Sequence, residues 1–175
     1  MKKYLLICLI TTVGMFAQKP AKTPNANLET ITLGGGCYWC VEAIYENLNG
    51  VKSAVSGFSG GTKVNPSYEE VSNGDTGYAE VVQITYDKTV TNLDEILKVF
   101  FTVHDPTTLN RQGADSGTQY RSVIFYKNAQ EKATAQSIIA ALKKVKAYDN
   151  PIVTKLEPFT KFYKAEDYHQ NYYAN

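Results

Sequence analysis

The sequence predicts an α+β fold: a ferredoxin-like βαββαβ two-layer sandwich with long functional loops and an irregular C-terminal tail. Two observations predict it. Short segments rich in β-branched residues alternate with longer segments whose apolar residues recur every three or four positions. The composition of the 175 residues, 43% hydrophobic and 20% charged, is that of a globular protein with a core.

The first half of the domain is expected to hold three strands and one long helix. The expected elements are a strand at 29–33, a helix at 38–48, strands at 51–58 and 79–86, and a short helix near 68–70. The long helix ends before Asn49-Gly50, a pair that stops helices. Its apolar face consists of Val41, Ile44, Tyr45 and Leu48. The segment 59–77 is rich in Gly, Pro, Asn and Ser, which indicates a functional loop.

The second half of the domain is also expected to alternate between helices and strands. The expected elements are a helix at 92–104, a long polar loop at 104–118, a strand at 120–126, a helix at 129–146 and a strand at 152–156. The buried side of the first helix consists of Leu93, Ile96, Leu97, Phe100 and Phe101. The tail at 159–175 is aromatic and polar and has no clear period, so we expect it to be irregular.

The N-terminal 28 residues differ from the rest. Lys2 and Lys3 precede a short apolar run that ends near Ala17, a pattern typical of a secretory signal. We therefore divide the chain into a signal peptide (1–17), a flexible tether (18–28) and one domain (29–175), and expect export to a periplasmic or extracellular location. Anchoring to a membrane through an uncleaved N-terminus, or through a lipid on Cys8, is the alternative.

The net charge of +1 argues against a nucleic-acid partner, and we expect a monomer. Cleavage of the signal removes Cys8 and leaves Cys37 and Cys40. Two cysteines three positions apart close too small a loop to stabilise a fold, so they are expected to be redox-active or to bind metal.

Cys37 stands where glycines 34–36 end a strand and a helix begins. Unpaired N–H groups and the positive end of the helix dipole favour a thiolate there, which predicts a lowered pKa. Cys37 is therefore a candidate nucleophile.

Gly36-Cys37-Tyr38-Trp39 resembles the active-site signature of the peptide methionine sulfoxide reductase A family. Five further stretches resemble the same family, in order along the chain: 68–71, 76–82, 101–106, 109–122 and 165–172. The resemblance implies reduction of the S epimer of methionine sulfoxide in oxidised proteins and peptides, with no bound cofactor and no metal.

The resemblance also implies residue roles. Cys37 attacks the sulfoxide sulfur and Glu80, kept neutral by an apolar strand, protonates the oxygen. Tyr68 and Tyr120 hydrogen-bond that oxygen. The substrate-binding residues are Tyr38 and Trp39, which pack on the methyl group, and Asp115, which holds the substrate backbone.

The chain departs from the family pattern at three positions. Cys40 replaces a common Gly, and since the tail has no cysteine, we expect Cys40 to resolve the Cys37 sulfenic acid. Electrons would then come from thioredoxin or a thioredoxin-like reductant. Tyr38 replaces the commoner Phe, and Tyr78 replaces a His to which we assign no role.

Three other interpretations remain open at this point. A thioredoxin-type dithiol oxidoreductase would use Cys37 and Cys40 without Glu80 or Asp115. A copper-carrying module would coordinate a soft metal ion with the two thiolates. A zinc site could add His104 and His169, although their spacing does not fit a zinc finger.

Overall fold

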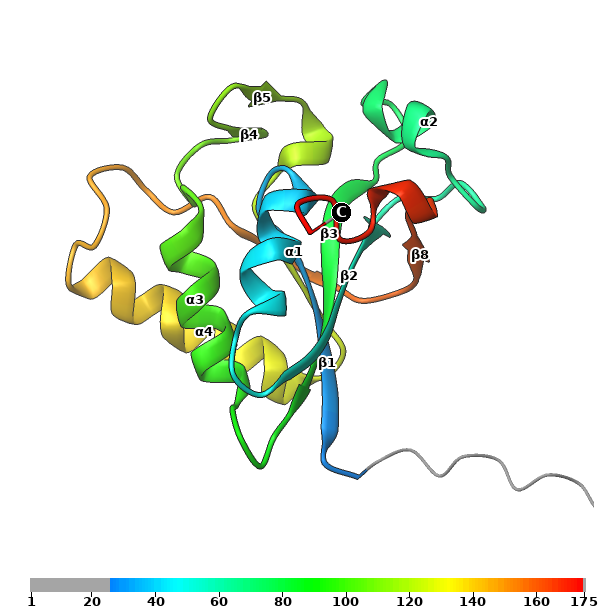
Figure 1. Cartoon of the computed structure of the whole chain (residues 1–175). Coiled ribbons are helices and arrows are strands. Elements are labelled where there is room, and N and C mark those ends of the chain that lie inside the picture. Colours follow the sequence, from blue (N-terminus) through cyan, green and yellow to red (C-terminus); the bar gives the residue numbers. More distant parts are fainter. Residues whose placement is uncertain (1–25, 175) are drawn as a thin grey trace, which may run out of the picture.

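The computed structural model describes residues 26–174, so the predicted signal peptide and most of the tether lie outside the described residues. Residues 26–174 form a mixed α/β fold around one mostly antiparallel sheet (Figure 1). The strands are β1 (Leu28–Gly34), β2 (Val51–Ser59), β3 (Ala79–Asp87), β4 (Arg111–Gln112), β5 (Asp115–Ser116), β6 (Val123–Tyr126), β7 (Lys155–Pro158) and β8 (Phe162–Lys164). The α-helices are α1 (Tyr38–Glu46), α2 (Tyr68–Ser72), α3 (Leu93–Val103) and α4 (Ala129–Lys144).

The large sheet has six strands in the order β7-β6-β1-β3-β2-β8. Strands β6, β1, β3 and β2 pair antiparallel, as do β2 and β8, whereas β6 and β7 pair parallel. The sequence predicted strands near the positions of β1, β2, β3, β6 and β7 but none at β8, so the sheet is wider than expected at the β2 edge. Strands β4 and β5 form a separate two-stranded ladder inside the predicted 104–118 loop.

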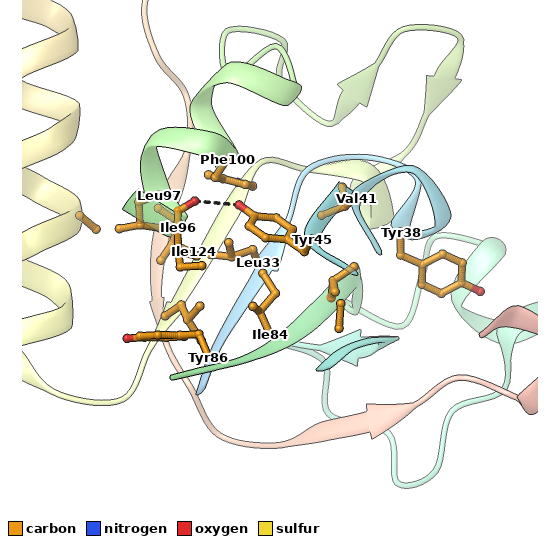
Figure 2. Close-up of a cluster of buried hydrophobic side chains, with 14 of the residues drawn as sticks. Leu33, Tyr38, Val41, Tyr45, Ile84, Tyr86, Ile96, Leu97, Phe100 and Ile124 are labelled. Carbon is orange, nitrogen blue, oxygen red and sulfur yellow. Dashed lines mark hydrogen bonds between the residues drawn. The ribbon is translucent and has the colours of Figure 1, made fainter. Parts of the chain in front are cut away.

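Alternation along β3 separates two apolar clusters. Val82, Ile84 and Tyr86 face the helices and belong to the main core, which Figure 2 shows between α1, α3 and the sheet. Ala79 and Val81 face the other way and pack with side chains from β6 and from the 159–162 segment. The period of two therefore places Glu80 on the same face as α1.

A polar contact ties α1 to α3 within the apolar core. The Tyr45 hydroxyl donates to the Ile96 carbonyl oxygen at 2.8 Å, drawn as a dashed line in Figure 2. Burying the ring supplies apolar area, and the hydrogen bond satisfies a hydroxyl that would otherwise be buried without a partner. This contact ties α1, whose N-cap residue is Cys37, to α3.

Several predicted boundaries are wrong. The helix expected to reach residue 48 ends at Glu46, and the one expected to reach residue 146 ends at Lys144. Ile44 is 37% exposed rather than core, because the apolar face of α1 is narrower than its sequence suggested. The strand expected at 120–126 begins at Val123, and residues 118–120 form a 3-10 turn.

The two C-terminal strand predictions are also corrected. The strand expected at 152–156 lies at Lys155–Pro158, since its register is set by pairing with β6. The tail is not wholly irregular, because Phe162–Lys164 adds β8 to the edge of β2 and residues 167–169 form a 3-10 turn. Within residues 26–174, no helix has the length and apolar character needed to cross a membrane.

Candidate active site

The chain turn before α1 depends on a glycine. Gly36 has a φ of 92°, a left-handed conformation that L side chains rarely adopt. A Cβ on Gly36 would lie 2.5 Å from side-chain atoms of Gln112, so the β4–β5 hairpin can pack here only if residue 36 has no side chain. The turn places Cys37 at the N-cap position of α1, half-buried, beneath that hairpin.

The predicted lowering of the Cys37 pKa is wrong. Burial raises the pKa of the Cys37 thiol to about 12, and this effect outweighs the lowering by the backbone N–H groups of Cys40 and Trp39. The nearby Cys40 and Glu80 raise it further when they carry negative charge. The N–H groups at the helix start therefore stabilise the thiolate too weakly to offset its desolvation. In the free protein Cys37 is a thiol at neutral pH.

Glu80 is the buried carboxyl of the site. Its side chain is 2% exposed, and its Oε2 accepts the Tyr38 backbone N–H at 3.2 Å. Burial raises the pKa of Glu80 to about 7, the Tyr38 N–H opposes the rise, and Asp115 adds to it. The pKa of Glu80 is therefore shifted in the direction predicted from its position in an apolar strand. The amide that it binds directly follows Cys37 in the chain, and the charge of Glu80 raises the pKa of the Cys37 thiol, so the two groups belong to the same site.

The electrostatic environment of Tyr120 shows which groups share the site. Burial raises the pKa of Tyr120 to about 12, and the charged forms of Glu80, Tyr68, Asp115 and Cys37 add to the rise. These groups come from the N-cap of α1, from α2, β3 and β5, and from the 118–120 turn. The fold therefore gathers five of the predicted residues from separate parts of the sequence.

The aromatic residues after Cys37 occupy different environments. Tyr38 is 1% exposed, and its hydroxyl has no hydrogen-bond partner among the described residues. Trp39 is half-buried and donates its Nε1–H to His169 Nδ1 at 3.2 Å. The His169 ring also lies 4.4 Å from the Tyr68 ring, centroid to centroid. Tyr38 is thus an inner wall of the site, whereas Trp39 retains an accessible surface.

The tail supplies residues to the site that sequence reasoning missed. Tyr172 stacks on Trp39, with ring centroids 3.9 Å apart and planes 5° from parallel. His169, considered above only as a possible zinc ligand, orients Trp39 through its ring nitrogen. The signal was present, because both lie in the 165–172 stretch that matched the family, but the stretch has no period that predicts a position in space.

Cys40 lies on the outer side of the first turn of α1. It is exposed, its Sγ is 3.6 Å from the Tyr173 hydroxyl, and both it and Cys37 are free thiols. A cavity of 250 Å³ opens beside the two cysteines. Its lining residues are Gly35, Cys37, Cys40, Val41, Ile44, Val103, Gln112, Gly113 and Asp115.

His104 is hydrogen-bonded through both of its ring nitrogens. The His104 ring contacts the Phe100 carbonyl oxygen at 2.6 Å and the Ser122 hydroxyl at 2.7 Å. Across residues 26–174, no group of three His, Cys, Asp or Glu side chains is arranged to hold a metal ion. The zinc interpretation therefore has no ligand cluster in this part of the chain.

The comparisons with known proteins agree with one another. A family model described as peptide methionine sulfoxide reductase matches residues 29–175. The peptide methionine sulfoxide reductase MsrA of Natronomonas pharaonis is 52% identical over 144 residues, covering 82% of this chain and 81% of that protein. Reduced Mxr1 from Saccharomyces cerevisiae has a TM-score of 0.80 at 36% identity, covering 89% of this chain and 90% of the other. Mxr1 in complex with Trx2 gives 0.61 at 27% identity, covering 88% and 91%.

These matches define the class of protein: an oxidoreductase that acts on methionine sulfoxide. The chain belongs to the peptide methionine sulfoxide reductase A family. The resemblance predicted from the sequence is confirmed, and the metal-carrying and thioredoxin-type interpretations are superseded.

Proposed function

We propose that this protein reduces the S epimer of methionine sulfoxide in peptides and proteins, with Cys37 as nucleophile and Glu80 as acid. The observation that carries the proposal is the buried Glu80 carboxyl, hydrogen-bonded to the amide that follows Cys37 and with its pKa raised to about 7. A carboxyl with that pKa is partly protonated at neutral pH and can donate a proton to the sulfoxide oxygen.

The Cys37 sulfur attacks the sulfoxide sulfur while Glu80 protonates the oxygen. Tyr68 and Tyr120 donate hydrogen bonds to the same oxygen without bringing charge into the site. The net step converts one thiol and one sulfoxide into one sulfenic acid and one thioether. Since Cys37 is a thiol in the free protein, its proton passes to the ionised form of Glu80 as the substrate binds, and Glu80 then gives this proton to the sulfoxide oxygen. The N–H groups of Trp39 and Cys40 stabilise the charge on the sulfur.

The substrate side of the site accounts for the proposed epimer choice. Trp39 provides an apolar surface for the methyl group, next to the wall formed by Tyr38. Asp115 is exposed and lines the cavity beside the two cysteines, where it can accept hydrogen bonds from the substrate backbone. With the methyl group and backbone held, only one epimer points its oxygen at Glu80.

Cys40 resolves the sulfenic acid by forming a disulfide with Cys37 and releasing water. A thioredoxin-like protein then reduces the disulfide, a proposal supported by the solved complex of Mxr1 with Trx2. We expect Cys40→Ser to perform one turnover and then fail to be recycled by thioredoxin. Sustained thioredoxin-dependent turnover by that variant would contradict the role of Cys40.

The experiment that tests the proposed function is turnover of the separate S and R sulfoxide epimers, with Cys37→Ser as the control. We expect activity with the S epimer only and none in the variant. Reduction of the R epimer at a comparable rate, or residual activity in Cys37→Ser, would contradict the proposal.

We also propose that the protein is exported, is monomeric, and either loses residues 1–17 or stays anchored through them. The charged start and short apolar run support export. The intact mass of the protein purified from its cells distinguishes cleavage near Ala17 from retention and from a lipid on Cys8. Sedimentation of the same sample checks the monomer.

A further inference from the structure

The C-terminal segment, residues 170–174, lies against the first turn of α1, and Figure 1 shows this end of the chain beside it. Two consecutive tail residues contact two residues of that turn. Tyr172 stacks on Trp39. The Tyr173 hydroxyl shares a 3.6 Å hydrogen bond with Cys40 Sγ, in which either group can be the donor.

The base of this segment is fixed to the buried part of the fold. The Asn171 backbone N–H donates to Glu42 Oε2 at 3.1 Å, and Glu42 is 1% exposed. The Gln170 side chain bonds the Ser56 backbone twice, accepting from its N–H at 3.1 Å and donating to its carbonyl at 3.0 Å. These contacts on α1 and β2 determine where the following tyrosines can reach.

Tyr173 stands on the open side of the Cys40 sulfur. Its side chain is 63% exposed, and Cys40 itself is exposed, so the phenol is not placed there by core packing. The hydrogen bond with Cys40 raises the pKa of Tyr173 to about 12, so the hydroxyl is protonated at neutral pH. The fixed base of the segment and this contact at its tip place the Tyr173 hydroxyl on the Cys40 sulfur.

We propose that Tyr173 is a positioning residue for Cys40: its hydroxyl holds the Cys40 sulfur against α1 and shields it from external reagents until Cys37 has been oxidised. The inference rests on the proposed function, because Cys40 needs protection only if it is the resolving thiol. Tyr173 does not contact the sulfoxide chemistry and acts through Cys40.

Disulfide formation during the redox cycle weakens the contact between Tyr173 and Cys40. The Cys40 thiol attacks the Cys37 sulfenic acid, so that an S–S bond forms, the S–O bond breaks and water leaves. Cys40 then has no S–H, and the hydrogen bond loses one of its two possible donors. The more exposed sulfur of the disulfide is that of Cys40, where a thiolate of the reductant can attack and release Cys37. A second reductant thiol completes the exchange, so the reductant is oxidised to a disulfide and both cysteines regain protons.

The test measures alkylation of Cys40 by iodoacetamide in the full chain carrying Cys37→Ser. Mass analysis of the peptide that contains Cys40 separates its labelling from that of Cys8. We expect Tyr173→Phe to raise the labelling rate about two- to fivefold, the range expected for losing one exposed neutral hydrogen bond. Tyr173→Ala should raise it further, because the ring is also removed.

Tyr168→Phe is the matched control, because Tyr168 is an exposed tyrosine of the same tail, 68% exposed. It should label at the parent rate, and all variants should keep the parent melting temperature. An unchanged or slower rate in Tyr173→Phe would overturn the proposal, even if Tyr173→Ala labels faster. Failure of the proposed function is separate, since it would appear as absence of a Cys37–Cys40 disulfide after one turnover of the otherwise unaltered protein.

Discussion

Replacing Glu80 by Gln should make the protein less active and more stable at alkaline pH. The amide keeps the size of the side chain and can still accept the Tyr38 N–H, but it cannot donate a proton. Loss of a general acid lowers rates by about 10²–10⁴-fold, so we expect a loss of that size in single-turnover reduction of the S epimer.

The stability change follows from the raised pKa of Glu80, from 4.5 to about 7. Below pH 4.5 the carboxyl is neutral in both the folded and the unfolded chain. As the pH rises to 7 the unfolded chain ionises first, so the unaltered protein loses about 3 kcal/mol of folding free energy relative to acid conditions. The Gln variant has no such loss. Its stability advantage over the parent should therefore grow by about 3 kcal/mol between pH 4.5 and pH 8.

Urea unfolding of both proteins at pH 4.5 and pH 8 measures this difference. Glu69→Gln is the matched control, because Glu69 is exposed on α2 and its carboxyl stays in water on folding. A stability difference between Glu80→Gln and the parent that is the same at both pH values would refute the reasoning. If the stability difference depends on pH but Glu80→Gln keeps full activity, the pKa of Glu80 is raised as stated and Glu80 is not the acid of the reaction.

Three further outcomes are expected. The alkylation rate of Cys37 in the free protein should keep rising with pH beyond pH 9, since burial raises its pKa to about 12; a plateau below pH 7 would contradict this. Tyr68→Phe and Tyr120→Phe should each slow S-epimer turnover by about 10²-fold, as measured by single-turnover kinetics, and an unchanged rate would exclude that hydroxyl from oxygen binding. Gly57→Ala should destabilise the fold by about 1–3 kcal/mol in urea, because its Cβ would lie 2.3 Å from the Tyr163 carbonyl oxygen; a neutral effect would mean that β8 can move aside.

Local sequence patterns were sufficient to predict β3 and α3. The alternation of 79–86 predicted β3 to within one residue, and the apolar spacing after Asn92 predicted α3, whose N-terminus Asn92 caps by accepting the Glu95 N–H at 3.0 Å. The tail strand β8 was missed because three residues carry no period. It forms only because the edge of β2 offers unpaired backbone groups, and this is a property of the assembled sheet.

The sequence by itself determined the family and the order of the core elements, because motifs and apolar periods can be read along the chain. It also supplied the sulfur of Cys37 and the carboxyl of Glu80 that we propose for the reaction. Only the tertiary structure decided the ionisation of Cys37, which the helix start alone would have lowered and which burial raises. It also decided that residues 172 and 173, more than 130 positions after the helix start, contact Trp39 and Cys40. Desolvation and long-range contact depend on what surrounds a group in space, and no local pattern contains that information.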